Sequence, residues 1–231
     1  MQNSDWRDPT GWRVGSRAGS LARALLRLES WSLVICLAVL CWLAGNPSYA
    51  GGRPGKADPD LVQVAPFPPG GDFRLRSARG PETLASLRGQ VVLLFFGYIT
   101  CPDVCPTTLG TLQHATARLT PEEQSQLRIA FVSLDPERDT PAILKDYVAA
   151  FPVPGLGLTG SRAQIDAMVE RYGAQYLRVA LPGSGMGYGI DHSAAVYLLD
   201  QRGRLRLLLR HTASPARFAD EIRRLLRKPV G

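Results

Sequence analysis

The chain has 231 residues, 45% of them hydrophobic, which suits one globular domain with appended segments rather than a disordered protein. Its net charge of +7 arises from 27 lysine and arginine residues against 20 acidic ones, and the basic residues are scattered instead of forming the runs that bind nucleic acid. No GxxxxGKS/T or GxGxxG phosphate-binding loop follows an expected strand, so the sequence argues against nucleic-acid partners and nucleotide chemistry.

An uncharged apolar segment lies near the N-terminus. Residues 31–44 contain no charged side chain, and the residues before them carry five arginines against three acidic residues, the usual flank of a membrane-insertion signal. This stretch is short for the ~20 residues that cross a bilayer, but residues 45–50 extend it. We therefore expect a transmembrane anchor over 31–50 and a basic cytoplasmic tail over 1–30. The alternative is a cleaved signal peptide, because SYA at 48–50 matches the small-x-small cleavage pattern.

Both interpretations place the later residues outside the cytoplasm. A bacterial inner membrane, with the C-terminal domain in the periplasm, is favoured over a mitochondrion because Asp5 and Asp8 are unfavourable in a transit peptide. Residues 51–71 concentrate glycine and proline without a sustained hydrophobic period, which predicts a flexible linker. The remaining residues, 72–231, are expected to form the folded domain.

Strand and helix patterns alternate from residue 72 onward. Residues 90–98 and 127–134 are continuous apolar runs with the length and composition of strands buried on both faces. Apolar residues at helical spacing predict a helix after each strand. The first is expected to begin near Cys105, and the second at Pro141 after a Thr140 cap.

Two further helices and a hairpin complete the expected domain. Ser161 and Gln164 form a capping-box pattern, and Ser214-Pro215 opens the last helix. Between these helices, residues 195–199 and 205–209 are apolar runs joined by a turn-rich segment, which predicts a hairpin. The order β-α-β-α-(β)-α-β-β-α indicates a single α/β domain with a mixed sheet flanked by helices. Ligands in such folds bind at the carboxyl ends of strands, where strand 90–98 leads into CPDVCP.

The four cysteines form two pairs of different character. Cys36 and Cys41 lie in the apolar N-terminal segment, where cysteine behaves as a small hydrophobic residue. Cys101 and Cys105 lie at the expected start of a helix, where the thiols can converge and the helix N-terminus favours the thiolate. Three interpretations of this second pair remain. It is a structural disulfide with a short loop, a thiol–disulfide exchange pair with one residue more than the usual CxxC, or a pair of soft ligands for a metal such as copper.

The chain has three histidines that could complete a metal site. His114 occupies a polar position of an expected helix, and His211 lies between the last strand and the last helix, so both are expected to be structural or exposed. His192 lies where a glycine-rich segment passes into a buried strand. A hydrogen-bonded structural histidine is the more common occupant of such a position, so the pattern alone leaves its role open.

Four features together resemble the Sco/SenC family of copper-binding proteins, which is associated with cytochrome c oxidase assembly. They are the N-terminal anchor and, in this order, GYITCPDVCP at 97–106, VSLDPERDT at 132–140 and GYGIDHS at 187–193. The likeness covers about residues 60–228. It implies a thioredoxin-like fold in which Cys101, Cys105 and His192 bind copper, Cu(I) through these three ligands and Cu(II) with a further one.

The resemblance also suggests roles for the residues around these ligands. Asp103 and Asp191 are candidates for the further Cu(II) ligand, although loop carboxylates that contact backbone N–H groups are the simpler interpretation. The acidic and basic residues of DPERDT are expected mainly to order the turn between strand and helix, with electrostatic contact to the site: Asp135, Glu137, Arg138 and Asp139. The glycine-rich residues 181–189 depart from the family pattern and predict flexibility. Met186 within them is expected to be a loop residue rather than a ligand.

These inferences lead to a hypothesis of a copper metallochaperone. It would receive copper from a donor protein and pass it by ligand exchange to an extracytoplasmic client, the binuclear copper centre of an oxidase subunit. The alternative is a thiol–disulfide reductase that uses Cys101 and Cys105 to keep client cysteines reduced. A peroxide-reducing relative of thioredoxin is a more distant third interpretation.

Overall fold

The computed structural model describes Trp42 and residues 58–227. The predicted basic tail, the rest of the predicted membrane segment 31–50, and the cysteines within it lie outside these residues. Within the described part of the chain, no helix has the length and apolar character needed to span a bilayer.

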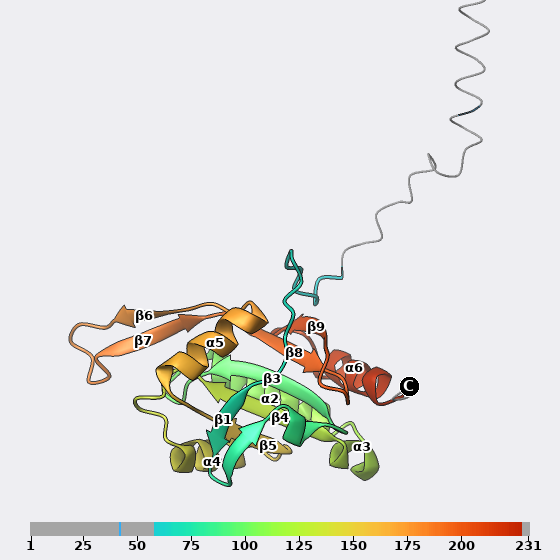
Figure 1. The fold of residues 1–231 in the computed structure, drawn as a ribbon, viewed down its shortest axis with the longest axis horizontal. Coiled ribbons are helices and arrows are strands. Elements are labelled where there is room, and N and C mark those ends of the chain that lie inside the picture. Colours follow the sequence, from blue (N-terminus) through green and yellow to red (C-terminus); the bar gives the residue numbers. More distant parts are fainter. Residues whose placement is uncertain (1–41, 43–57, 228–231) are drawn as a thin grey trace, which may run out of the picture. The chain divides into compact units, whose positions relative to one another are not determined.

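A five-stranded sheet forms the centre of the domain, in the order β5-β4-β3-β8-β9 (Figure 1). Three parallel strands are followed by an antiparallel hairpin: β3 (Val91–Gly97), β4 (Leu127–Ser133), β5 (Gly155–Leu158), β8 (Ala195–Leu199) and β9 (Leu205–Arg210). Every residue of β3 is buried, as expected for an apolar run covered on both faces. The predicted mixed sheet is therefore confirmed.

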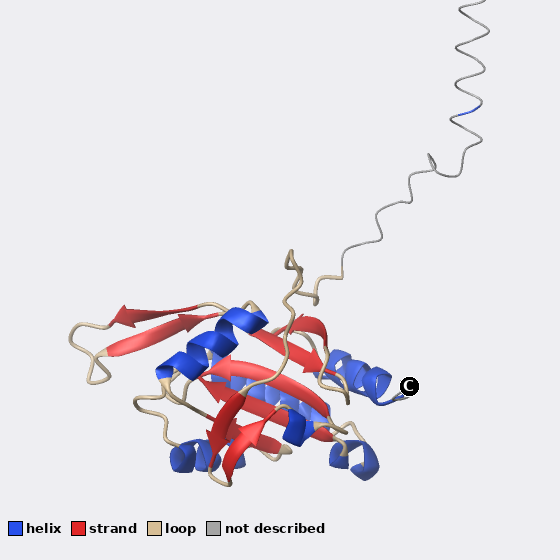
Figure 2. Ribbon diagram, in the orientation of Figure 1, coloured by secondary structure: helices blue, strands red, loops and turns tan. Residues whose placement is uncertain are grey.

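Helices cover both faces of this sheet (Figure 2). One face packs against α2 (Val104–Thr116), α4 (Pro141–Ala149) and α6 (Pro215–Arg227), and the other against α5 (Arg162–Tyr172). Along β3, Leu93 and Phe95 join the first core, whereas Leu94 and Phe96 join the second. This division follows from the alternation of side chains along a strand.

The helix starts follow the capping signals in the sequence. The Thr140 side chain accepts a hydrogen bond from the Ile143 N–H at the start of α4, with proline in the first turn. Ser161 and Gln164 form the predicted reciprocal capping box of α5. Gly173 caps the C-terminus of that helix, and its φ of 64° lies in the left-handed region that glycine adopts without strain.

Several short elements escape the sequence pattern. They are the hairpin of β1 (Arg74–Ser77) and β2 (Gly80–Thr83), the 3-10 helix η1 (Ala85–Leu87), the short helix α3 (Pro121–Ser125), and the hairpin of β6 (Tyr176–Ala180) and β7 (Tyr188–His192). Each is only three to five residues long, too short to show a period. The glycine-rich segment 181–189 includes the turn between β6 and β7 and the first two residues of β7.

Part of the segment expected to be a linker belongs to the folded unit, which begins at Asp58. The Asp60 carbonyl oxygen accepts from the Arg210 N–H at 2.8 Å, and the Val62 N–H donates to the Leu208 carbonyl oxygen at 2.9 Å. These backbone bonds attach the segment to β9. A linker interpretation based on glycine and proline content cannot detect them, because they depend on residues 150 and 146 positions away.

Candidate metal centre

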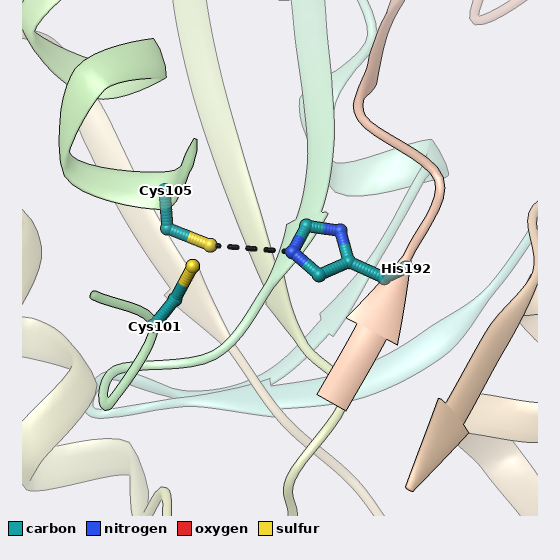
Figure 3. Close-up of side chains that lie close together, drawn as sticks. All are labelled: Cys101, Cys105 and His192. Atoms are coloured by element: carbon teal, nitrogen blue, oxygen red, sulfur yellow. Dashed lines mark hydrogen bonds between the residues drawn. The ribbon is translucent and has the colours of Figure 1, made fainter. Parts of the chain in front are cut away.

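Cys101, Cys105 and His192 lie together at the carboxyl end of β3 (Figure 3). Their ligand atoms all lie within 4.8 Å of one another. Cys101 comes from the loop after β3, Cys105 from the first turn of α2, and His192 from the end of β7. Two segments that are distant in the sequence, the loop and first turn that carry both cysteines and the end of β7, thus bring two sulfur atoms and one imidazole together, where the strand order predicts a site.

The end of β3 makes room for the buried thiol. A Cβ atom at Gly97 would lie 2.6 Å from the Cys105 Sγ and 2.7 Å from the Phe131 ring, so any larger residue would displace one of them. The Cys101 N–H donates to the Tyr98 carbonyl oxygen at 3.3 Å and closes a tight turn. Cys105 is fully buried, Cys101 is partly exposed, and the two thiols are free.

The two thiols differ in their affinity for protons. A hydrogen bond from the Cys105 thiol, supported by the N–H groups at the start of α2, lowers the pKa of Cys101 to about 4 despite its partial burial. The same contact and its deeper burial raise the pKa of Cys105 above the ordinary range. Because two adjacent buried thiolates repel each other, the metal-free pair holds one negative charge and one proton at neutral pH.

The imidazole of His192 presents one nitrogen to this pair. Its Nδ1 lies 3.1 Å from the Ser193 carbonyl oxygen, which can only accept, so Nδ1 carries the hydrogen. The Nε2 then faces the Cys105 Sγ at 3.6 Å (Figure 3). The ring packs edge-on against Phe95 and Tyr98, with centroids 6.1 and 6.0 Å away. These contacts fix the orientation of the ring before any metal arrives.

The chemistry of the donors fits a soft metal ion. Thiolate and imidazole ligands select copper or zinc over magnesium, calcium or manganese, which prefer oxygen. Among the described residues, Cys101, Cys105 and His192 are the only histidine, cysteine or acidic side chains that come together in a group able to hold a metal ion. A structural zinc site is almost always four-coordinate, whereas copper accepts two thiolates and an imidazole. The residues present therefore suit copper.

The other candidate ligands lie outside this group. The carboxylate of Asp103 accepts from the Thr107 hydroxyl at 3.2 Å rather than from a backbone N–H. Asp191 is exposed and, as the neighbour of His192 in β7, projects from the opposite face of the strand. Met186 is 42% exposed in the turn between β6 and β7, which agrees with its expected place in a loop.

The two remaining histidines play no part in the centre. His114 is exposed on α2. The Nδ1 of His211 lies 3.0 Å from the Ala194 carbonyl oxygen, a structural contact.

A cavity of about 410 Å³ opens beside the centre and has His192 in its wall. The residues lining it come from β6, β7 and the segments next to them: Gln175, Tyr176, Leu177, Asp191, His192 and Ser193. Leu177 is 66% exposed there. The cavity adjoins the residue that carries the imidazole, and neither cysteine lines it.

Residues of the 135–139 turn bond to the segments that carry the proposed ligands, in addition to the turn-ordering role expected from the sequence. The Asp139 carboxylate accepts from the Ile99 N–H at 3.0 Å and from the Ser133 hydroxyl at 2.6 Å, and so holds the loop that carries Cys101. Burial raises the pKa of Asp139, while these two hydrogen bonds oppose the rise. Tyr188, which the sequence did not single out, donates to Asp135 at 2.7 Å. The alternation of GYGIDH was the available signal, because it places Tyr188 and His192 on one face of a strand.

The fold and the site define a thioredoxin-like α/β protein with a Cys-x-x-x-Cys and histidine centre. The SCO1/SenC family model matches residues 64–227. The chain therefore belongs to the SCO1/SenC family.

Related proteins come from bacteria and mitochondria. The chain is 37% identical over 185 residues to a mitochondrial SCO2 homologue of Bos taurus, covering 79% of this chain and 68% of the relative. It is 37% identical over 139 residues to an SCO2-like protein of Rickettsia prowazekii, covering 58% of this chain and 66%, just under two thirds, of that relative.

Solved structures of relatives share the fold. Copper-bound ScoI of Bradyrhizobium japonicum is 36% identical with a TM-score of 0.62, and the match covers 68% of this chain and 99% of that one. Copper-bound yeast Sco1 is 30% identical with a TM-score of 0.62, and the match covers 71% of this chain and 91% of that one.

Proposed function

We propose that this protein is a copper metallochaperone that binds copper through Cys101, Cys105 and His192. The observation that carries the proposal is the convergence of two thiols and an imidazole, of which one thiol has a lowered pKa and the imidazole already presents Nε2 to the thiols. Membership of the SCO1/SenC family and the copper-bound relatives support it. In this role the protein catalyses no reaction, and copper is its cargo.

Release of copper proceeds by exchange of ligands. Cys101 is partly exposed and Cys105 is fully buried, so a client thiolate or imidazole displaces the Cys101 side of the centre first. Each new bond from the client replaces one bond to this protein, so the ion is never without ligands. When copper leaves, Cys105 takes up a proton again, because two adjacent thiolates are unfavourable in a buried site.

The proposed partners are a protein that donates copper and, as client, the copper-bearing subunit of cytochrome c oxidase. The proposed location is the bacterial inner membrane, with residues 31–50 as a single-pass anchor and the copper domain in the periplasm. The charge asymmetry around residues 31–44 supports this orientation.

A second function is favoured by the asymmetry of the two thiols. In a thiol–disulfide reductase, the Cys101 thiolate attacks one sulfur of a client disulfide, forms a mixed disulfide and releases one client thiolate. Cys105 then loses its proton and attacks the Cys101 sulfur, which releases the second client thiolate and leaves a Cys101–Cys105 disulfide. A dithiol reductant must then reduce this disulfide before another cycle.

Substitution of His192 separates the two functions. We expect His192→Ala to lower copper affinity by about 10-fold or more, because one of three ligands is lost, while dithiol exchange with a model disulfide continues. His211→Ala is the matched control, because it removes a partly buried imidazole that also contacts a backbone carbonyl oxygen. Copper affinity is measured by competition with a chelator on the reduced full chain. Equal copper affinity of His192→Ala and the unchanged chain would sink the metal-site assignment.

A further inference from the structure

The hairpin that carries His192 is separate from the central sheet. Strands β6 and β7 pair only with each other, in a two-stranded sheet. The hairpin extends beyond the edge of the main sheet, and His192 is its last residue (Figures 1 and 3). The position of the imidazole therefore depends on the contacts that join this hairpin to the domain.

Tyr188 is at the centre of these contacts. Its hydroxyl donates to the carboxylate of Asp135, which is fully buried, at 2.7 Å. The guanidinium groups of Arg138 and Arg178 lie over its ring, 3.8 and 4.6 Å from the ring centroid. Arg138 also donates to the carbonyl oxygens of Met186 and Tyr188, at 3.1 and 3.3 Å. Both the side chain and the backbone at the start of β7 are thus held by the turn 135–139.

This contact can be transmitted to His192 along the strand. Tyr188, Ile190 and His192 lie on one face of β7 because alternate residues of a strand share a face. Ile190 is 4% exposed and packs in the core between them. Holding Tyr188 therefore limits rotation and sliding of the face that presents the imidazole.

The same turn holds the loop that carries Cys101. Asp139 binds the Ile99 N–H two residues before Cys101, and the Asp139 N–H donates to the Asp135 carbonyl oxygen at 2.8 Å. One short segment thus contacts the histidine side of the centre through Asp135 and Arg138, and the cysteine side through Asp139.

We propose that the turn 135–139 and Tyr188 form a positioning device that holds the His192 imidazole at binding distance from the two thiols. Its consequence for copper rests on the proposed function. Tyr188 affects copper affinity only by positioning His192. A residue that merely stabilised the domain would affect copper affinity whether or not His192 were present.

A double-mutant comparison tests this distinction. We expect Tyr188→Phe, which removes only the hydroxyl bonded to Asp135, to lower the copper affinity of the full chain by about 10-fold. In the His192→Ala background the same substitution is expected to leave copper affinity unchanged. Tyr172→Phe is the matched control, because it removes a hydroxyl that donates to the Gly71 carbonyl oxygen at 2.8 Å, away from the centre, and it is expected to have no effect in either background. An equal loss from Tyr188→Phe in both backgrounds would overturn the proposal.

A measurement without metal distinguishes failure of this inference from failure of the proposed function. In the reduced, metal-free chain, Tyr188→Phe is expected to shift the 15N resonance of His192 Nε2, because that atom loses its 3.6 Å contact with Cys105. Tyr172→Phe is expected to leave this resonance in place. An unshifted His192 resonance in Tyr188→Phe would refute the positioning role, whatever metal the centre binds.

Discussion

The chemical difference between Cys101 and Cys105 arises from their places on either side of the start of α2. Cys101 precedes α2 and meets its free N–H groups, while Cys105 lies inside the first turn beneath Gly97 and Phe131. The partly exposed Cys101 thiol therefore carries the charge, and the buried Cys105 thiol keeps the proton. This division suits metal exchange, because a client meets the ligand that is already ionised.

At the residue scale, this difference predicts selective alkylation. Cys101 should react with iodoacetamide at mildly acidic pH, where an ordinary thiol with a pKa of about 8.5 is protonated, and Cys105 should stay unmodified. Mass spectrometry of the reduced, metal-free chain locates the label. Cys105→Ala removes the hydrogen bond that most lowers the pKa of Cys101. The pH at which the alkylation rate of Cys101 rises should therefore move to a higher value. Equal labelling of both cysteines in the unchanged chain would contradict this electrostatic account.

Two elements meet closely at the end of β3. Gly97 allows the first turn of α2 to approach the strand, and this approach brings the Cys105 Sγ to the carboxyl edge of the sheet. Gly110, within α2 itself, has no neighbouring atom near the position of a Cβ. The two glycines thus differ in what an added methyl group would meet.

At the element scale, we expect Gly97→Ala to lower the free energy of unfolding by about 1–3 kcal/mol, the usual cost of overpacking. Copper affinity should fall as well, because Cys105 or Phe131 must move. Gly110→Ala is the matched control and should increase stability by about 0.5–1 kcal/mol, since alanine favours a helix interior. Chemical denaturation and chelator competition measure the two effects. A Gly97→Ala chain with unchanged stability and affinity would show that the close approach is not required.

Over the whole molecule, local patterns predict the elements better than the contacts between them. The capping signals at Thr140 and Ser161 and the apolar run of β3 act within a few residues, so the sequence reveals them directly. The bond between Tyr188 and Asp135 spans 53 positions, and no local period encodes it. Motif resemblance pointed to His192 as a ligand, but the orientation of its ring depends on packing against Phe95 and Tyr98 from other elements.

Copper binding should be coupled to the release of one proton, because the metal-free centre holds one thiolate and one protonated thiol. The pKa of Cys101 is lowered, so this group is already ionised at neutral pH and releases nothing. The pKa of Cys105 is raised, so copper must displace its proton. The apparent copper affinity should therefore rise by about 10-fold for each pH unit between neutral and mildly alkaline conditions.

Chelator competition at several pH values on the reduced full chain measures this slope, and Cys105→Ala should abolish most of it. A slope of two protons per copper ion would mean that Cys101 is also protonated, and a flat profile would mean that Cys105 is already ionised.

Copper binding should also stabilise the fold, because folding brings His192 to two cysteines that lie about 90 positions away in the sequence. The expected gain is about 2.7 kcal/mol at a free copper concentration 100 times the Kd. His192→Ala should reduce that stabilisation, because the same copper concentration is a smaller multiple of the larger Kd of the weakened site.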